Sequence, residues 1–333
     1  MSPLKVVHVG LGPIGLAIAE AVAGSTSVVS VAAVDPLLSG RDLGELLGGP
    51  ETGVTVAAEL DEALAGRQTD VALHCTGSQL ARVEDQLHAL IGRGLSVVST
   101  CEELSWPWFH HPDEAQRLDT AAKAAGVRLL GTGVNPGFVM DLLPVVLSGV
   151  AARVDSVVVH RVVDASTRRL PLQAKVGAGS SEAEFRERAA RGALGHMGLV
   201  ESVAMIAAGL GWSVDEIHQV LDPVLADAPI RGAAIAVEAG QVRGLHQVAT
   251  GSIGGQRKIT LDLVMALGAE SPGDTVVLQG EPPLEVRIAG GIHGDIATVA
   301  AVVKALPRIG RVRPGLLSVL DLPAAAARSE SEI

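Results

Sequence analysis

The segment Gly10–Gly15 constrains the fold more than any other part of the chain, because it reads Gly-Leu-Gly-Pro-Ile-Gly between two hydrophobic stretches. Residues 5–9 before it predict a short buried strand, and residues 16–22 after it predict a helix. Glycines at this spacing permit a tight turn, close approach of the backbone to a pyrophosphate and close helix packing, and the helix start directs N–H groups at phosphate. A turn with a purely structural role is the alternative. We expect this turn to bind a dinucleotide through Gly10, Gly12, Pro13, Ile14 and Gly15.

The next predicted strand, residues 28–34, ends at Asp35, where a ribose-binding carboxylate belongs in such a unit. A carboxylate at this position repels the 2′-phosphate of NADP and favours NAD. Arg41 could reach a 2′-phosphate if Asp35 turned away. We therefore expect NAD as the cofactor, with some use of NADP.

The first 140 residues alternate strand and helix patterns, which is typical of a parallel doubly wound sheet. Further strands are predicted at residues 70–76, 96–101 and 127–133, with a helix at 83–93. The predicted fold class is α/β, with a dinucleotide-binding Rossmann domain in residues 1–140. Ligands of such sheets lie beyond the carboxyl ends of the strands, so each strand end is a candidate site.

Beyond residue 140 the pattern changes to long strands and amphipathic helices, which predicts a second α+β domain with an open sheet in residues 141–292. We expect this domain to bind substrate and to dimerise. A helix at about residues 293–323 is expected to pack back on the first domain. The other expected elements are strands at 154–164, 242–248, 259–266, 274–278 and 284–288, and helices near 182–191, near 199–209 and from Ser213.

Composition excludes several classes of function. The formal net charge of −11 repels nucleic-acid phosphates, so we expect no nucleic-acid partner. No apolar stretch approaches the ~20 residues of a membrane span, and the first residues do not resemble a signal peptide. Cys75 and Cys101 do not form a disulfide framework, and no Cys/His spacing indicates a metal site. The expected protein is cytoplasmic, with neither metal nor membrane.

Two adjacent carboxylates, Glu102 and Glu103, directly follow the predicted strand at 96–101, at the sheet edge where a nicotinamide would lie. Burial raises the pKa of a carboxyl group, which suits proton exchange near neutral pH. A helix-start pair that stabilises the following helix dipole is the alternative. We expect Glu102 to be the catalytic base, with Glu103 as the second candidate. Cys101 is disfavoured as a nucleophile because no basic residue stands beside it.

The other strand ends carry polar and glycine residues that fit cofactor contacts. The segment Gly131–Phe138 is a second glycine-rich strand end, where Asn135 could hydrogen-bond the nicotinamide amide or the substrate. A turn that only redirects the chain is the alternative there. The expected additional cofactor contacts are Thr76, Gly77, Ser78, Thr100, Asn135 and Pro136.

Candidate substrate-binding residues come from separate parts of the second half. His196 lies between glycines, His293 precedes the last predicted helix, and Arg161 lies on the strand at 154–164. A histidine satisfied in the core is the alternative for His196, and surface ion pairs are the expectation for Arg168 and Arg169. The expected substrate-binding set is Asn135, Phe138, Arg161, His196 and His293.

The combination of motifs resembles the family of 2,4-diaminopentanoate dehydrogenases and native amine dehydrogenases, over roughly residues 5–323. The first motifs are also shared with dihydrodipicolinate reductases and homoserine dehydrogenases. The segments that carry the resemblance are S-T-C-E-E-L at 99–104, G-V-N-P-G-F at 133–138 with Met140-Asp141, P-L-Q-A-K-V-G-A-G at 171–179, G-H-M-G-L-V-E-S at 195–202 and G-I-H-G-D at 291–295.

This resemblance implies a homodimer that interconverts an amine and NAD(P)⁺ with a carbonyl compound, ammonia and NAD(P)H. The family's glutamate corresponds here to Glu102 or Glu103, and it would hold ammonia or the iminium and move protons. The implied substrate is a small aliphatic amine or a diamino acid. Two alternatives stay open: another Rossmann oxidoreductase, such as a cyclic-imine reductase or a hydroxy or amino acid dehydrogenase, and a non-catalytic NAD-binding sensor.

Overall fold

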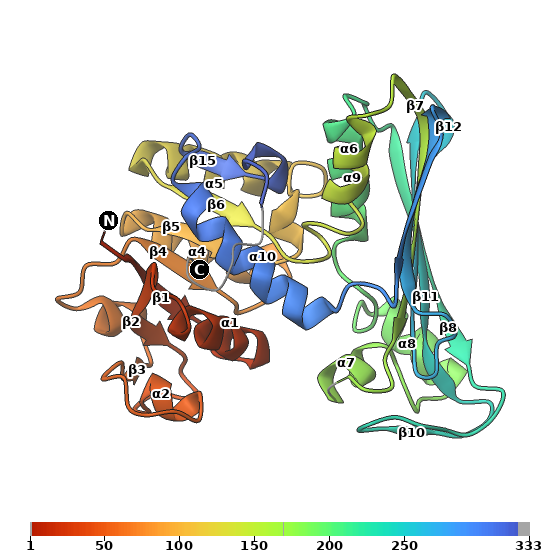
Figure 1. The fold of residues 1–333 in the computed structure, drawn as a ribbon. Helices are drawn as coiled ribbons and strands as arrows, with labels where there is room; N and C mark the ends of the chain where they lie inside the picture. The colour runs from red at the N-terminus through yellow and green to blue at the C-terminus, as the bar shows by residue number, and fades with distance from the viewer. Residues whose placement is uncertain (1, 169, 326–333) are drawn as a thin grey trace. The chain divides into compact units, whose positions relative to one another are not determined.

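The structure is a computed structural model that describes residues 2–168 and 170–325. The chain divides into two compact units, drawn in Figure 1. The first unit combines residues 1–137 with 294–333, and the second comprises residues 138–293. Each unit has its own sheet.

The first unit contains a seven-stranded parallel sheet with the order β15-β6-β5-β4-β1-β2-β3, which confirms the predicted Rossmann class. The strand order reverses between β1 and β4, so the carboxyl ends of these two strands flank the point where such sheets bind ligands. The strands are β1 (Leu4–Val9), β2 (Val28–Val34), β3 (Val56–Ala57), β4 (Val71–His74), β5 (Ser96–Ser99), β6 (Arg128–Gly131) and β15 (Gly315–Leu317).

The helices of the first unit pack in pairs, α1 against α10 and α4 against α5. The helix expected at about 293–323 ends earlier, at Ile309. Gly310 follows it directly, Pro314 cannot continue a helix, and the next residues form β15 along β6 instead. The helices are α1 (Pro13–Ala23), α2 (Leu43–Leu46), α3 (Leu60–Leu64), α4 (Leu80–Gly92), α5 (Pro112–Ala125) and α10 (Gly294–Ile309), with the 3₁₀ turns η1 (Glu103–Ser105) and η2 (Val319–Asp321).

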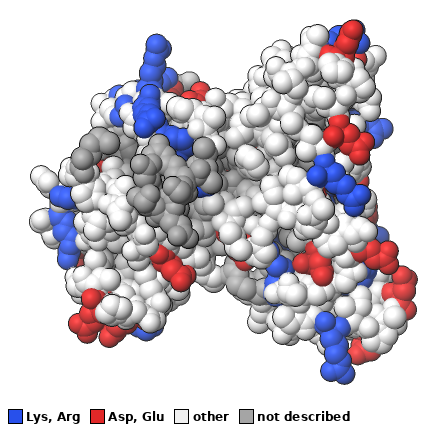
Figure 2. Space-filling model, in the orientation of Figure 1, with Lys and Arg blue, Asp and Glu red and all other residues white. Residues whose placement is uncertain are grey.

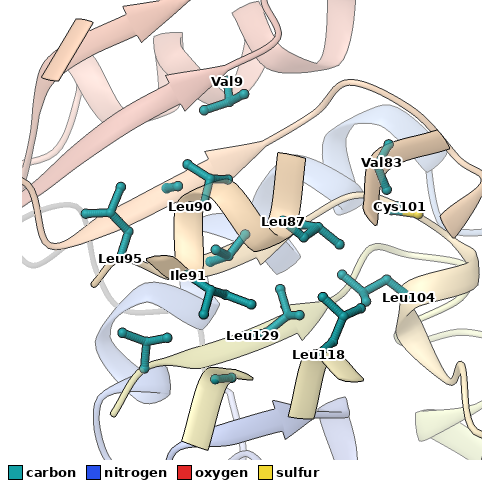
Figure 3. Close-up of a cluster of buried hydrophobic side chains, with 14 of the residues drawn as sticks. Val9, Val83, Leu87, Leu90, Ile91, Leu95, Cys101, Leu104, Leu118 and Leu129 are labelled. Atoms are coloured by element: carbon teal, nitrogen blue, oxygen red, sulfur yellow. The ribbon is translucent and has the colours of Figure 1, made fainter. Parts of the chain in front are cut away.

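A hydrophobic core joins α4 and α5 to this sheet, as Figure 3 shows for Leu87, Leu118 and Leu129. Cys101 and Leu104 belong to the same core and are almost fully buried. Burial of each large apolar side chain contributes about 1.5–3 kcal/mol. The turn between β5 and α5 is therefore anchored by buried side chains on both sides of the Glu102-Glu103 pair.

The second unit contains a six-stranded mixed sheet with the order β14-β13-β7-β12-β11-β8, in which only the β7–β12 pair is parallel. The strands are β7 (Arg153–Asp164), β8 (Glu216–Leu225), β11 (Val242–Ile253), β12 (Gln256–Ala266), β13 (Gly273–Glu281) and β14 (Leu284–Ala289), with a separate hairpin of β9 (Ile230–Arg231) and β10 (Ala236–Val237). The helices are α6 (Leu142–Ser148), α7 (Leu170–Lys175), α8 (Glu182–Ala190) and α9 (Leu199–Gly209).

The helix expected from Ser213 is wrong, because residues 216–225 form the edge strand β8. The prediction rested on Ser213 as an N-cap followed by Asp215 and Glu216, and the apolar residues at 217, 220, 221 and 224 also fit a helical period. Pro223 opposes a helix interior and is tolerated on an edge strand. Backbone pairing with β11 along the whole strand decides the outcome.

One face of the mixed sheet is covered and the other is open. Figure 1 draws α6 and α9 on one face and, among the described residues, no helix on the other. On β7, Val157 and Val159 are buried toward the helices, while Val158 is half-buried and His160 is exposed on the opposite face. The open face thus carries valines that the described part of the chain leaves partly accessible.

Candidate active site

The glycine-rich turn that follows β1 is packed closely against neighbouring backbone atoms. Gly10 has a φ of +86°, and its N–H donates to the Val34 carbonyl at 2.9 Å. A Cβ on Gly10 would lie 2.8 Å from the Cys75 carbonyl oxygen, and one on Gly15 would overlap the Gly10 carbonyl oxygen. Only glycine fits either position, because conformation and space exclude a side chain at Gly10 and space alone excludes one at Gly15.

The start of α1 faces open space. Gly12 is the N-cap with no side-chain cap, Pro13 occupies the first turn, and a Cβ on Gly12 would meet none of the described atoms within 4 Å. The first N–H groups of the helix therefore point into room for an anion, next to a residue without a side chain. These residues fit the pyrophosphate of a dinucleotide, with Ile14 half-buried behind them.

Asp35 is held in place at the end of β2. Its Oδ2 accepts from the Leu11 N–H at 2.8 Å and its Oδ1 accepts from the Leu37 N–H at 2.9 Å. Arg41 could bind a 2′-phosphate only if the Asp35 side chain turned outward. The two backbone donors oppose that movement. Arg41 is exposed, and its carbonyl accepts from the Val56 N–H at 2.8 Å. This geometry favours ribose hydroxyls over a 2′-phosphate.

The ends of β4 and β5 are joined by hydrogen bonds. The buried His74 ring lies 2.8 Å from Ser99 Oγ and 2.8 Å from Thr76 Oγ1, and the Thr100 N–H donates to the His74 carbonyl at 3.0 Å. Burial lowers the pKa of His74, so the ring is neutral. The residues expected to contact the cofactor from these two strands, Thr76, Gly77, Ser78 and Thr100, thus lie on adjacent loops.

The two carboxylates of the pair have different surroundings. Glu103 Oε2 accepts from the Leu80 N–H at 2.6 Å and lies 3.3 Å from His111 Nε2. Glu102 is half-buried at the start of η1, and its carbonyl accepts from the Ser105 hydroxyl at 2.5 Å. The Glu103 side chain is therefore committed to the first N–H of α4.

The two cysteines are not activated. Burial raises the pKa of Cys101 to about 12, with the charges of Glu102 and Glu103 adding to the effect, and burial raises the pKa of Cys75 to about 12. Both are free thiols. A thiol that stays protonated at neutral pH is a poor nucleophile, so burial disfavours Cys101 in that role.

The glycine-rich end of β6 folds into a compact loop. The Val134 N–H donates to Thr298 Oγ1 on α10 at 3.3 Å, and a Cβ on Gly137 would lie 2.5 Å from the Gly133 backbone. Asn135 is buried in this loop, and the Asn135–Pro136 peptide bond is cis. The first unit therefore brings the ends of β1, β4, β5 and β6 to one edge of its sheet.

In the second unit, Arg161 and Asp274 form a buried ion pair of 2.7 Å that holds the loop before His293. Arg161 Nη2 donates to the Ile292 carbonyl at 2.8 Å, and Asp274 Oδ2 accepts from the Ile292 N–H at 2.7 Å. Burial lowers the pKa of Arg161, and the Asp274 carboxylate opposes that effect. The pair clamps both backbone groups of Ile292.

His293 itself is exposed, and Arg168 Nη1 lies 2.9 Å from its Nε2. Because a guanidinium only donates, Nε2 is the acceptor, and the neutral ring carries its proton on Nδ1. Arg168 is buried, so the expectation of a surface ion pair is wrong for it, while Arg169 lies outside the described residues. Gln173 Nε2 binds the Arg168 carbonyl at 3.0 Å and so supports the loop.

His196 is presented in a similar way by Gln247. The His196 N–H donates to Gln247 Oε1 at 2.8 Å, and Gln247 Nε2 donates to the His196 carbonyl at 2.9 Å. Gln247 is buried on β11. A side-chain amide thus replaces a strand partner for the His196 backbone.

Phe138 begins the second unit and is 40% exposed. Its carbonyl accepts from the Leu143 N–H at 2.8 Å. Asp141 Oδ1 caps α6 at the Leu142 N–H, and its Oδ2 accepts from the Ser202 hydroxyl at 2.8 Å. These contacts fix the chain that follows Phe138 against α9.

Sequence reasoning missed four supporting residues, Arg168, Gln173, Gln247 and Asp274. Each is buried and polar, and each bonds the backbone or the side chain of a loop residue. Gln173 lay within the P-L-Q motif of the resemblance, which was a usable signal. Arg168 was interpreted as a surface residue, and Gln247 and Asp274 carried no local pattern that marked them.

The comparisons with known proteins agree with this architecture. A family profile described as the 2,4-diaminopentanoate dehydrogenase C-terminal domain matches residues 138–332. The 2,4-diaminopentanoate dehydrogenase of Acetoanaerobium sticklandii is 31% identical over 340 residues, covering 97% of this chain and 94% of that protein. The chain belongs to the 2,4-diaminopentanoate dehydrogenase family. The family predicted from the sequence motifs is thereby confirmed.

Other relatives of this member of the 2,4-diaminopentanoate dehydrogenase family have amine dehydrogenase activity in their names. An amine dehydrogenase of Streptomyces virginiae is 23% identical over 94% of both chains. The solved structure of an amine dehydrogenase from Mycobacterium smegmatis is 25% identical, covers 98% of both chains and superposes with a TM-score of 0.87. The predicted class, an NAD(P)-dependent amine dehydrogenase, is confirmed.

The described surface gives no single dominant charge on the face drawn in Figure 2, where acidic and basic side chains are interspersed. No helix in residues 2–168 and 170–325 combines the length and apolar character needed to cross a membrane. Within the same residues, no three or more His, Cys, Asp or Glu side chains gather in a way that could hold a metal ion.

Proposed function

We propose that this enzyme catalyses reductive amination of a small aliphatic carbonyl compound with Glu102 as its base. The balanced reaction is R₂CH–NH₃⁺ + NAD⁺ + H₂O ⇌ R₂C=O + NH₄⁺ + NADH + H⁺. The observation that carries the proposal is the position of Glu102, which is half-buried at the carboxyl edge of the sheet, beside the loops that fit a dinucleotide. The neighbouring Glu103 accepts from the Leu80 N–H and lies 3.3 Å from His111.

The cofactor contacts proposed for the first unit follow the edge of its sheet. The pyrophosphate would meet the α1 N-terminus at Gly12–Gly15, the ribose would meet Asp35, and the nicotinamide end would lie along Thr76–Ser78, Thr100 and Asn135. The bound nicotinamide supplies a hydride donor or acceptor at one ring carbon. We expect a preference for NAD because both Asp35 oxygens are held by backbone donors.

Glu102 moves protons on the substrate nitrogen. In the direction of amination, its carboxylate accepts a proton from ammonium, which frees the lone pair that attacks the carbonyl carbon. The protonated carboxyl then returns the proton to the departing hydroxyl of the carbinolamine, so that water leaves. The resulting carboxylate stabilises the iminium cation by its negative charge while hydride arrives.

Half of the chain's six aromatic side chains follow this pair: Trp106, Trp108 and Phe109. The Trp106 and Trp108 rings meet edge to face at 4.8 Å, and Trp108 and Phe109 are 37% and 36% exposed. We propose that they contribute an apolar wall near Glu102. The small number of aromatic residues in the chain therefore does not decide whether aromatic side chains line the proposed pocket, because half of them lie close to Glu102 in sequence.

We propose that the substrate carries a hydrogen-bond acceptor such as a carboxylate. The Arg168 guanidinium lies 2.9 Å from Nε2 of His293, whose ring is exposed. The relative that is 31% identical is named for 2,4-diaminopentanoate, an amine with a carboxylate. Arg161 then acts through the loop it clamps, and we propose His196 and Phe138 as further substrate contacts.

We also propose a homodimer formed through the open face of the mixed sheet. This face combines half-buried valines with His160 and His246, which lie 3.3 Å and 2.8 Å from the two oxygens of Asp262. Val264→Glu on this face should give a monomer in size-exclusion chromatography with light scattering, whereas an unchanged mass would reject this surface. The free thiols and the use of NAD(H) support a cytoplasmic location.

A single assay tests the reaction. NADH oxidation is measured with simple ketones and with oxo acids, with and without ammonium. We expect turnover only with ammonium, and we expect Glu102→Gln to lower kcat about 10²–10⁴-fold while NADH binding persists. Turnover that does not depend on ammonium would reject the proposal and indicate a carbonyl reductase. No turnover together with tight NADH binding would favour a sensor.

A further inference from the structure

Glu103 connects three segments that meet at the proposed base. Its Oε2 accepts from the Leu80 N–H, the first of α4, at 2.6 Å. The same oxygen lies 3.3 Å from Nε2 of His111, which caps α5. The Glu103 side chain is only 16% exposed, so these contacts are shielded from water. One carboxylate thus ties the end of β5 to the starts of α4 and α5.

The backbone beside Glu103 is tied to the same loop. The Glu103 N–H donates to the Ser78 carbonyl at 3.3 Å, and the Cys101 thiol donates to that carbonyl at 3.2 Å. Ser78 belongs to the loop expected to contact the cofactor. Glu102 therefore lies between two residues that are both hydrogen-bonded to Ser78, in the loop that follows β4.

We propose that Glu103 is a positioning residue that sets the place of the Glu102 carboxylate relative to the cofactor loop of β4. The inference rests on the proposed role of Glu102 as the base. A carboxylate is suited to this task because it accepts strongly from an N–H at the positive end of the 13-residue helix α4. The contact with His111 restrains the carboxylate from a second side.

The length of the Glu103 side chain matters more than its charge under this proposal. Glu103→Gln keeps an oxygen within reach of the Leu80 N–H and loses the charge. Glu103→Asp keeps the charge and withdraws the oxygen by one methylene, out of reach of the 2.6 Å contact. A base would show the opposite pattern, because an amide cannot accept a proton.

The test compares kcat, the KM for ammonium and the Kd for NADH in both variants of the full-length enzyme. We expect Glu103→Gln to keep kcat within about 3-fold of wild type, because a neutral hydrogen bond retains roughly half the strength of a charged one. We expect Glu103→Asp to lower kcat about 10–100-fold at unchanged Kd for NADH, since a misplacement of 1 Å can have that effect.

Glu84 provides a matched control. It lies on α4, is 18% exposed and pairs with Arg117 on α5 at 2.8 Å. Glu84→Asp should leave kcat unchanged, and thermal unfolding of every variant reports folding. The two Glu103 variants are conservative, and NADH binding by either one shows that its first unit is folded.

Each outcome is decisive. Loss of activity in Glu103→Gln with full activity in Glu103→Asp would overturn the inference and make Glu103 the base. Wild-type kcat in both variants, with Glu102→Gln inactive, would overturn the positioning role and leave the proposed function standing. Full activity of Glu102→Gln would instead reject the proposed base itself.

Discussion

The two units hold their candidate site residues in different ways. In the first unit, the turn after β1 is shaped by glycines and closed by backbone contacts, and Gly10, Gly12 and Gly15 lie within six residues of sequence. In the second unit, the loops that carry His196 and His293 are clamped by the buried side chains of Gln247, Arg161 and Asp274 from separate strands. The proposed cofactor site thus rests on local backbone geometry, and the loops proposed for substrate rest on long-range polar contacts.

Among the variants that test this difference between the units, Asp274→Asn is expected to have the largest effect. It leaves the buried Arg161 guanidinium without its counter-ion, which should lower the free energy of unfolding by about 3–5 kcal/mol. The control is Asp155→Asn on β7, the strand that carries Arg161, where the pair with Arg153 is exposed and contributes no more than about 1 kcal/mol. Urea unfolding measures both. Equal losses of unfolding free energy in the two variants would show that the buried Arg161–Asp274 pair stabilises the second unit no more than the exposed pair does.

Acid should weaken the first unit selectively. Burial lowers the pKa of His8 from 6.5 to about 4, so the unfolded chain takes up a proton that the folded chain refuses. Stability is therefore full above pH 6.5 and falls by about 3 kcal/mol as pH drops to 4. Hydrogen exchange against pH in wild type and in His8→Gln measures this. Parallel pH profiles for the two proteins would contradict the assignment to His8.

Alanine substitutions at two glycines of the turn after β1 should affect stability and NADH binding separately. Gly15→Ala forces a Cβ into the Gly10 carbonyl, so we expect a loss of about 1–3 kcal/mol in unfolding free energy. Gly12→Ala points a Cβ into open space, so stability should hold while the Kd for NADH rises. Urea unfolding and NADH fluorescence titration distinguish the two. Unchanged NADH affinity in Gly12→Ala would place the pyrophosphate elsewhere.

The smallest expected effect concerns cofactor choice. Asp35→Ser removes the carboxylate held by Leu11 and Leu37 and should shift the ratio of kcat/KM toward NADP by about tenfold, or roughly 1.4 kcal/mol. Adding Arg41→Ala should cancel the gain if Arg41 meets the 2′-phosphate. A wild type that already prefers NADP would reject the argument from Asp35.

Much of the first unit was predictable, because its signals are local. The βα pattern around Gly10–Gly15, the position of Asp35 and the carboxylates after β5 follow from short-range periodicity and spacing. The elements that were mispredicted, β8 and the end of α10, are those whose backbone partners come from distant sequence. A helical period and an edge strand look alike until a neighbouring strand supplies hydrogen bonds.

The sequence by itself determined the α/β class and placed the candidate Glu102-Glu103 pair after a strand, because glycine spacing and strand patterns act over a few residues. Its motifs carried the resemblance to the family. Only the tertiary structure decided that Glu103 caps α4, that Arg168 is buried beside His293, and that Gln247 holds His196. Those contacts join residues separated by 23, 125 and 51 positions. Their geometry depends on how the strands and helices pack, which no short stretch of sequence encodes.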